Sequence, residues 1–265
     1  MKMCSIASGS SGNCIYIGTE ATHLLVDVGI SCKRIVEGLN QLGLKGQDID
    51  GILITHEHAD HINGLGVISR KFGIPIYATP GTINAIKQTG SLGTIEDELF
   101  HEVQADEKMI VKDITVNPMK ISHDAAQPVA YRFQYGSRRM AVVTDLGTYD
   151  DYTVESLKGM DALMLEANHD INMLQVGPYP YYLKQRILGK RGHLSNELSG
   201  KLLSQLMHDN LKAVCLGHLS KENNLEELAY ETVRLEISMS DNPYKPDDFP
   251  IFVANRSELS QMVEI

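Results

Sequence analysis

The chain has 265 residues, of which 43% are hydrophobic and 22% charged, a composition that is ordinary for a globular protein. It can bury a core without disulfides or partners, and a single domain spanning residues 1–265 is expected. The formal net charge of −10 at pH 7 argues against a protein that coats nucleic acid or anionic membranes by bulk electrostatics, but not against a nuclease that holds cations at its site.

Strands and helices alternate along the first half of the chain. Short apolar runs are separated by Ser/Gly-rich and Gly-Thr turns, and the run GILIT at residues 51–55 reads as a buried strand. The predicted elements are strands at residues 4–7, 13–17, 23–28 and 51–55, and helices near residues 32–42 and 61–72.

The second half repeats this alternation. The predicted elements are strands at residues 114–121, 129–134, 140–144, 162–166, 213–216 and 251–253, and helices near residues 152–158, 194–208 and 225–236. Sheets with helices on their outer faces follow from this order, so the fold class is α/β. The alternation leaves the strand pairing open.

Signals for secretion or membrane insertion are missing from the sequence. The start MKMCSIASGSSGNC has no apolar segment after its lysine, and no stretch approaches the ~20 apolar residues of a membrane span. The four cysteines form no CxxC pair and are expected to be reduced and structural. We therefore expect a cytoplasmic protein that does not interact with membranes.

A dense cluster of histidines follows the strand at residues 51–55. The six residues HEHADH at 56–61 hold three of the ten histidines of the chain, where chance would place about 0.2. Alternate residues of an extended backbone point the same way, so His56 and His58 can converge on one ion. Asp60 and His61 lie where a helix begins, directed towards a neighbouring ion.

Other parts of the chain must complete these sites, because a zinc- or manganese-like ion takes four to six donors. His123, Asp145 and His218 each lie at the end of a predicted strand, although each alone would be interpreted as structural. The Asp145 carboxylate can bridge two ions about 3.5–4 Å apart. The predicted sets are His56, His58, His123 and Asp145 for one ion, and Asp60, His61, Asp145 and His218 for the other.

The pattern His-x-His-x-Asp-His after a strand, followed by separate His, Asp and His, resembles the metallo-β-lactamase superfamily over nearly the whole chain. The resemblance implies a four-layer αββα sandwich of two mixed β-sheets flanked by helices. Asp27, in LLVDVG at residues 24–29, matches the first motif of that superfamily, where the acid orients a metal ligand. Its alternative reading is a turn residue at a strand end.

Four longer stretches resemble the bacterial YycJ (WalJ) family: CSIASGSSGNC at residues 4–14, THEHADHING at 55–64, LEANHD at 165–170 and RGHLSN at 191–196. The resemblance implies a hydrolase with 5′-to-3′ exonuclease activity on double-stranded DNA, related to tRNase Z and the RNase J group. It also suggests a role in DNA repair.

Two segments are candidates for phosphate binding. Hydroxyls and closely approaching amides of Ser10, Ser11 and Asn13 suit phosphate oxygens, although Ser/Gly runs are more often simple turns. Lys190 and Arg191 end a stretch of four positive side chains. Without further context, such a stretch is interpreted as a solvent-exposed face. They come just before a predicted helix N-terminus, which favours anions.

Three further residues of the second half are candidates for contact with the substrate. His193 resembles the additional histidine that nucleases of this superfamily place over the scissile phosphate, and Ser195 follows it. A solvent-facing loop residue is the alternative for His193. His169 follows a strand near the site, and its role stays open.

The expected reaction is attack on phosphorus by a hydroxide that bridges the two ions. Asp60 would orient the hydroxide, and His193 would stabilise the transition-state charge. No GxSxG motif supports a serine nucleophile. The alternatives are an RNA-processing nuclease of the same fold and a lactam or thioester hydrolase; the latter has no need of His193 and the adjacent cations. DNA is the expected binding partner and RNA is the alternative; protein partners are not predicted. The expected cofactors are two divalent ions, and the predicted ligands suit Zn²⁺ and Mn²⁺ equally.

Overall fold

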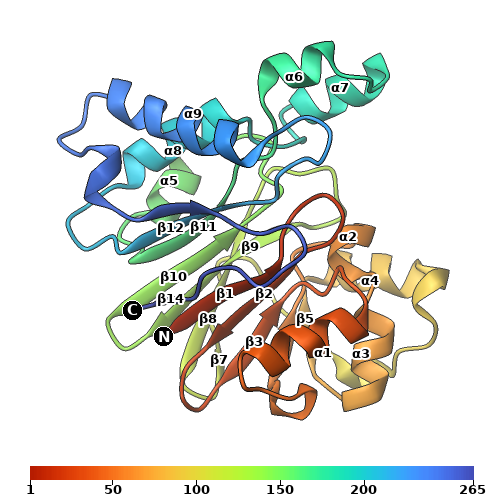
Figure 1. The fold of residues 1–265 in the computed structure, drawn as a ribbon. Helices are drawn as coiled ribbons and strands as arrows, with labels where there is room; N and C mark the ends of the chain where they lie inside the picture. Colours follow the sequence, from red (N-terminus) through yellow and green to blue (C-terminus); the bar gives the residue numbers. More distant parts are fainter.

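Two seven-stranded mixed sheets lie face to face with helices on their outer faces in the computed structural model, which describes residues 1–265 (Figure 1). The predicted four-layer αββα sandwich is confirmed. The first sheet has the order β14-β1-β2-β3-β4-β5-β6. Its strands are β1 (Lys2–Ala7), β2 (Cys14–Gly18), β3 (His23–Val26), β4 (Gly51–Leu53), β5 (Ile76–Ala78), β6 (Phe100–Glu102) and β14 (Val263–Glu264).

The second sheet has the order β13-β12-β11-β10-β9-β8-β7. Its strands are β7 (Met109–Val111), β8 (Ile114–Lys120), β9 (Val129–Tyr135), β10 (Arg138–Val143), β11 (Ala162–Glu166), β12 (Ala213–Gly217) and β13 (Ile251–Val253). In both sheets antiparallel hairpins give way to parallel strands, from β3 in the first and from β10 in the second. The carboxyl ends of neighbouring parallel strands therefore lie side by side, which is where α/β proteins bind ligands.

Helices cover the outer face of each sheet (Figure 1). Those beside the first sheet are α1 (Cys32–Gln41), α3 (Leu65–Phe72) and α4 (Pro80–Gln88); those beside the second are α5 (Asp151–Leu157), α8 (Asn196–Leu206) and α9 (Glu226–Met239). The other three helices are α2 (Ala59–Ile62), α6 (Ile171–Val176) and α7 (Tyr181–Leu188). None of the helices combines the length and the apolar character that a membrane crossing needs.

Side-chain oxygens fix where several helices begin. Each accepts a hydrogen bond from the backbone N–H three residues further on, which satisfies one of the free donors of the first turn. These N-cap residues are Ser31 for α1, Thr79 for α4, Asp150 for α5, Asp170 for α6 and Ser195 for α8.

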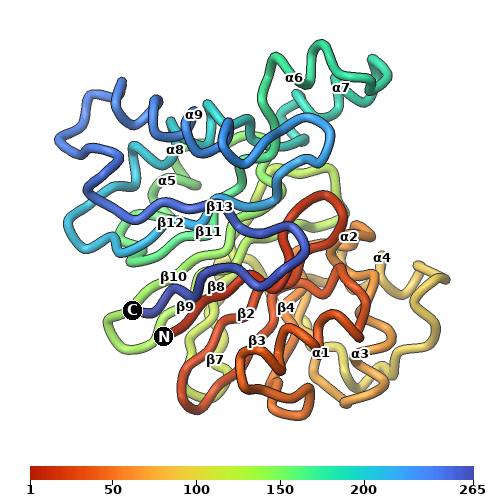
Figure 2. Tube along the Cα trace, in the orientation of Figure 1, coloured from red at the N-terminus to blue at the C-terminus, as the bar shows by residue number.

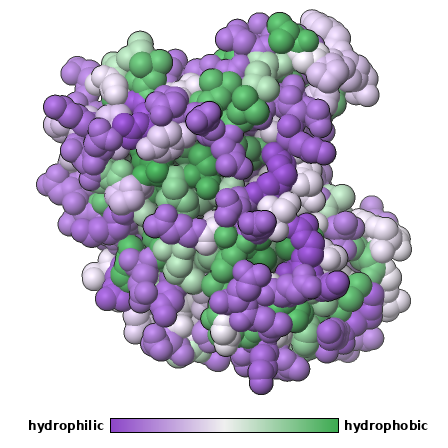
Figure 3. All heavy atoms as spheres, in the orientation of Figure 1, coloured by the Kyte–Doolittle hydropathy of each residue, from purple (hydrophilic) through white to green (hydrophobic).

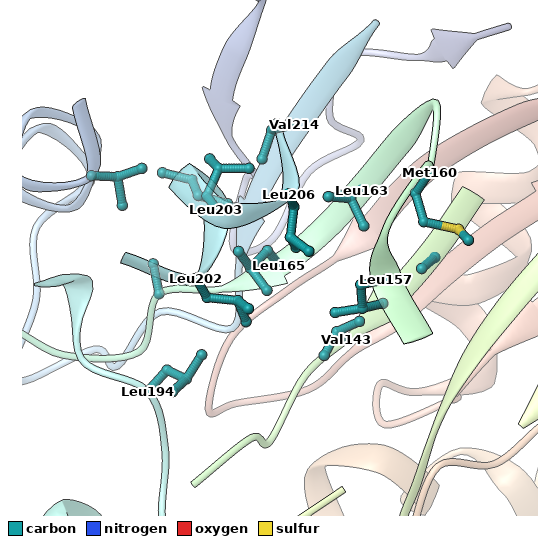
Figure 4. Close-up of a cluster of buried hydrophobic side chains, with 14 of the residues drawn as sticks. Val143, Leu157, Met160, Leu163, Leu165, Leu194, Leu202, Leu203, Leu206 and Val214 are labelled. Atoms are coloured by element: carbon teal, nitrogen blue, oxygen red, sulfur yellow. The ribbon is translucent and has the colours of Figure 1, made fainter. Parts of the chain in front are cut away.

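The core consists of one apolar layer between the sheets and one under each set of helices. Strand β11 shows how a continuous apolar run serves two layers, because successive side chains point to opposite faces. Leu163 and Leu165 pack under α8 (Figure 4), whereas Met164 packs against the first sheet. Burial of the strand on both faces thus explains why it lacks polar alternation.

The two chain ends meet at the edge of the first sheet (Figure 2). Strand β14 pairs antiparallel with β1, and the amino group of Met1 donates a hydrogen bond of 2.7 Å to the carbonyl oxygen of Ile265. The strand at the C-terminus therefore completes a sheet that the N-terminal half begins.

The predicted helix near residues 61–72 differs from the structure, where the chain forms α2 and α3 with a break between them. Gly64 at the break donates its N–H to Val28 O, at 2.8 Å. A Cβ atom on Gly64 would lie 2.1 Å from Ile30 O, so this turn packs directly against the chain that follows β3.

Seven elements were not predicted: β5, β6, β7, β14, α4, α6 and α7. The strands among them have two or three residues, which leaves little alternation to recognise, although β4 and β13 are as short and were predicted. Helices α6 and α7 are short and separated by a segment containing two prolines and a glycine, which indicated a loop.

Candidate metal centre

Three polar residues at strand ends adopt a left-handed backbone conformation. Asp27 follows β3 with φ of 57°, Asp145 follows β10 with φ of 58°, and His218 follows β12 with φ of 57°. This conformation is unfavourable for residues other than glycine, at a cost of about 1–3 kcal/mol each. Strained residues of this kind gather at functional sites, and here all three turn towards one place.

The seven predicted ligand residues converge there. His58 Nδ1 lies 3.2 Å from His123 Nε2, and His218 Nε2 lies 3.4 Å from Asp60 Oδ2. Asp145 Oδ2 lies 3.1 Å from His61 Nε2 without forming a hydrogen bond. Four groups of donor atoms are close enough to hold an ion. Three consist of predicted ligands: His56, His58 and His123; Asp60, His61 and His218; and His56, His61 and Asp145, which joins the other two. The fourth adds two further residues to predicted ligands: Asp145, Glu166, His193 and His218.

The nitrogens on the other side of the imidazole rings are held by oxygen atoms. His61 Nδ1 lies 2.7 Å from Asp27 Oδ2, and His218 Nδ1 lies 2.8 Å from Glu166 Oε1. His123 Nδ1 lies 3.0 Å from the carbonyl oxygen of Gly192. Metal-binding histidines are fixed in this way, with one nitrogen on an acceptor and the other towards the ion.

His56 gives a direct test of the fit. Its Nδ1 lies 3.0 Å from Thr55 Oγ1, whereas its Nε2 is buried and has no partner in the protein. A buried polar atom without a partner is unfavourable unless something else satisfies it. The residues present therefore fit divalent cations, with four ligands from the turn after β4 and three from the second sheet.

The charges of the buried groups suit this interpretation. Burial raises the pKa of Asp145, but the charges of His218 and His61 outweigh it and hold that pKa well below its usual range. Burial lowers the pKa of His56 well below its usual value, which keeps this imidazole neutral. For His218 burial also lowers the pKa, yet the charge of Asp145 outweighs it and raises the pKa to about 10. Cation binding would displace such protons.

Glu166, which the sequence analysis did not predict as a site residue, connects the ligands to His193. It is fully buried at the end of β11, and its carboxylate lies 2.8 Å from His218 Nδ1 and 2.9 Å from His193 Nδ1. It also accepts hydrogen bonds from two backbone N–H groups, those of Leu146 and Leu194. Burial raises its pKa, but the charge of His193 opposes this, and the pKa falls to about 2.

The sequence placed Glu166 at the end of a predicted strand, as it did Asp145 and His218. Only the structure shows that this strand lies between β10 and β12, which are followed by Asp145 and His218. Acidic residues at the carboxyl ends of adjacent parallel strands are expected to lie together.

The metal centre opens into a cavity of about 360 Å³. The side chains of His58 and Asp60 are 28% and 27% exposed, whereas those of the other predicted ligands are buried. Ser10 and His193 line this cavity, as the prediction of substrate contacts requires. Asn168 also lines it and was not predicted; its Nδ2 donates to His218 O at 2.9 Å.

Three other predicted substrate residues do not line this cavity. Asn13 is fully buried, with its Nδ2 3.2 Å from His61 Nε2, and Ser195 is buried as the N-cap of α8. His169 is only 1% exposed, and burial lowers its pKa to about 4. In this structure these three side chains are held inside the protein rather than facing the cavity.

Three predicted residues lie on the surface near the ligand loops. Ser11, Lys190 and Arg191 are exposed. Arg191 donates through Nε to His123 O at 3.0 Å, and Lys190 O accepts a hydrogen bond from Ser122. The Lys190 backbone and the Arg191 side chain thus attach this segment to the loop that carries His123.

Comparison with known proteins identifies relatives of the whole chain. A model of the beta-lactamase superfamily domain matches residues 22–218, which includes every residue of the centre from Asp27 to His218. Exodeoxyribonuclease WalJ of Streptococcus pneumoniae serotype 2 is 40% identical over 240 residues, covering 91% of this chain and 89% of the relative. Exodeoxyribonuclease YycJ of Bacillus anthracis is 42% identical over 229 residues, covering 86% of each chain.

A solved structure agrees with these matches at the level of the fold. The crystal structure of Zn²⁺-bound PqqB from Methylobacterium extorquens has a TM-score of 0.74 over 100% of both chains, at 13% identity. The chain therefore belongs to the beta-lactamase superfamily and, within it, to the family of the WalJ and YycJ exodeoxyribonucleases.

Proposed function

We propose that the chain is a metal-dependent phosphodiesterase that degrades duplex DNA as a 5′-to-3′ exonuclease. The observation that carries the proposal is the convergence of seven nitrogen and oxygen donors beside an open cavity, with His193 on its wall and the buried Glu166 behind His193. The names of the relatives, both exodeoxyribonucleases, supply the substrate class.

Two bound divalent cations would supply a water of lowered pKa as nucleophile and would neutralise charge that develops on the phosphate. The ligand sets proposed for them are His56, His58, His123 and Asp145, and Asp60, His61, Asp145 and His218. The five imidazoles favour Zn²⁺, and the two carboxylates make the ligand sets compatible with Mn²⁺ as well.

The protein's own groups then orient and stabilise the substrate. Glu166 holds His193 through Nδ1, which leaves the other ring nitrogen free; when the ring carries both protons, this nitrogen can donate to a phosphate oxygen in the cavity. Stabilising an oxyanion with a donor that is already in position lowers the barrier without reorganisation during the reaction. Asp60, partly exposed on the same wall, orients the attacking water.

Contacts further from the scissile bond are proposed for the polar rim. Ser10 lies in the cavity wall, and Ser11, Lys190 and Arg191 are exposed close to it, suited to the phosphates of the strand. The proposal includes a cytoplasmic location, supported by four buried, unpaired cysteines, which suit a reducing compartment.

The test is cleavage by purified protein loaded with Mn²⁺ or Zn²⁺. End-labelled duplex DNA, single-stranded DNA, RNA and a chromogenic lactam are compared in parallel, with phosphorothioate linkages at one end or the other to read polarity. We expect shortening of duplex DNA that a 5′ block prevents. If only the lactam were hydrolysed, the assignment as a phosphodiesterase would be refuted. If RNA were cleaved faster than DNA, RNA would replace DNA as the proposed substrate.

A further inference from the structure

The segment from α6 to α7, residues 171–188 and here called the α6–α7 hairpin, projects beyond the second sheet (Figures 1 and 2). It carries the most exposed apolar and aromatic side chains of the molecule: Val176 at 86%, Tyr181 at 77% and Tyr182 at 75%. Large exposed side chains gathered on one element indicate a surface that binds something.

The α6–α7 hairpin is continuous with the metal centre. Tyr179, Leu183 and Arg186 line the cavity into which His58 and Asp60 open. Tyr182 lies four residues before Arg186 on α7, so both side chains are on one face of that helix. The α6–α7 hairpin therefore carries aromatic side chains both at the cavity wall and on the outer surface. Figure 3 shows an indentation of the molecular surface beside the hairpin.

The charge of this region is opposite to that of the chain. Residues 171–193 contain four Lys or Arg and no Asp or Glu, in a chain of net charge −10. Arg186 Nη2 donates to Asp124 Oδ1 at 3.1 Å, which ties α7 to the loop of His123. Such a surface suits a polyanion that also presents flat, stackable groups.

We infer that the α6–α7 hairpin is a stacking platform for unpaired bases at the end of the DNA strand. The inference rests on the proposed function and adds to it that the substrate end is frayed or overhanging. Stacking on aromatic side chains beside a cationic track is how proteins hold single strands without reading their sequence. Tyr181 and Tyr182 would take the bases, while Arg186 and Lys190 follow the phosphates.

A second copy of this chain is the competing occupant. In a two-fold dimer the same patch meets itself, so the cations of one α6–α7 hairpin would face those of the other. Like charges opposed across an interface are unfavourable. Charge complementarity and continuity with the cavity both favour nucleic acid.

The test uses the metal-loaded protein and a duplex with a four-nucleotide 5′ overhang that carries 2-aminopurine and phosphorothioate linkages. Stacking quenches 2-aminopurine fluorescence, so quenching measures the contact separately from cleavage. We compare wild type with Tyr181→Ala/Tyr182→Ala; the two hydroxyl groups make no hydrogen bond within the protein, so the fold should persist. Tyr135→Ala, at the end of β9, is the matched control.

We expect the double variant to bind the overhang about tenfold or more weakly, with quenching lost, because each stacked base contributes strongly to affinity. Tyr135→Ala should match wild type. Unchanged quenching in the double variant would overturn the inference of a stacking platform. The inference would also be overturned if the wild type were a dimer and the double variant a monomer. If wild type quenches the overhang but cleaves no DNA, the proposed function fails and the platform stands.

Discussion

The two halves of the molecule contribute to the metal centre in different ways. In the half built on the first sheet, one turn after β4 supplies four ligand candidates within residues 56–61. In the half built on the second sheet, His123, Asp145 and His218 follow three different strands. The first set can be recognised in the sequence because its members lie within six consecutive residues. The members of the second set are far apart in sequence and come together only because the fold aligns the ends of their strands.

The largest effect should follow from Asp145→Ala, because this residue joins the contributions of the two halves. Its Oδ2 lies 3.1 Å from His61 Nε2, and its Oδ1 lies 3.6 Å from His123 Nε2. We expect metal loss from both sites and a fall in phosphodiester cleavage of about a thousandfold or more, since bound metals supply several kcal/mol to the transition state. Metal content by mass spectrometry and cleavage rate are the measurements.

His58→Ala is the matched control for this prediction. His58 belongs to only one of the four donor groups, together with His56 and His123. Metal should leave one site and remain at the other. Two ions retained per chain in the Asp145 variant would rule out the bridge.

The next largest effect is expected for His193→Ala, which separates ligands from substrate contacts within the second half. The side chain is 17% exposed, lines the cavity and uses Nδ1 to bond Glu166. We expect both ions to be retained while kcat falls about 10²- to 10⁴-fold, the range for loss of a positioned acid-base group. His101→Ala, at an exposed position of β6 that does not line the cavity, should leave kcat unchanged. A kcat equal to that of wild type in the His193 variant would reject this role.

The extent to which the site could be predicted follows the same division between the halves. The cluster at residues 56–61 predicted a metal centre unaided, and His123, Asp145 and His218 could then be chosen because each ended a predicted strand. Glu166 was missed because a carboxylate that orients ligands adds nothing to a count of donors. Only the order β10-β11-β12 places it between Asp145 and His218.

Element length explains only part of what was predictable in the fold. Strands of six or seven residues such as β8 and β10 were found, whereas three-residue strands such as β5 and β6 were not. The equally short β4 and β13 were nevertheless predicted, and the nine-residue helix α4 was missed. Pairing of β14 with β1 joins the two ends of the chain, and no local pattern encodes such a contact. Burial of Asn13, His169 and Ser195 likewise depends on neighbours distant in sequence.

An intermediate effect is expected when the carboxylates behind the ligands are neutralised. Asp27 holds His61 in the first half, and Glu166 holds His218 in the second. Removing such a partner costs about 10- to 100-fold in metal affinity or activity. We expect Glu166→Gln to lose more activity than Asp27→Asn, because Glu166 also holds His193.

Metal affinity and kcat, measured for both variants, separate these contributions. Metal affinity should fall in both, and kcat at saturating metal should fall mainly in Glu166→Gln. If Asp27→Asn lowers kcat equally under saturating metal, the second half has no special role in positioning a catalytic group.

The smallest effect should come from Asp113→Ala, which cuts a link between the halves away from the metal centre. Thr19 Oγ1 donates to Asp113 Oδ2 at 2.9 Å, and the buried Thr22 hydroxyl donates to the same carboxylate. Leaving the Thr22 hydroxyl without its acceptor should cost about 1 kcal/mol, or about 2–4 °C in Tm. Asp97→Ala, which loses only an exposed ion pair with Lys87, should leave Tm almost unchanged. Both variants should still unfold in a single transition, because residues from both halves form the apolar layer between the sheets. Two separate transitions for Asp113→Ala would mean that the halves are held together by this link rather than by the shared core.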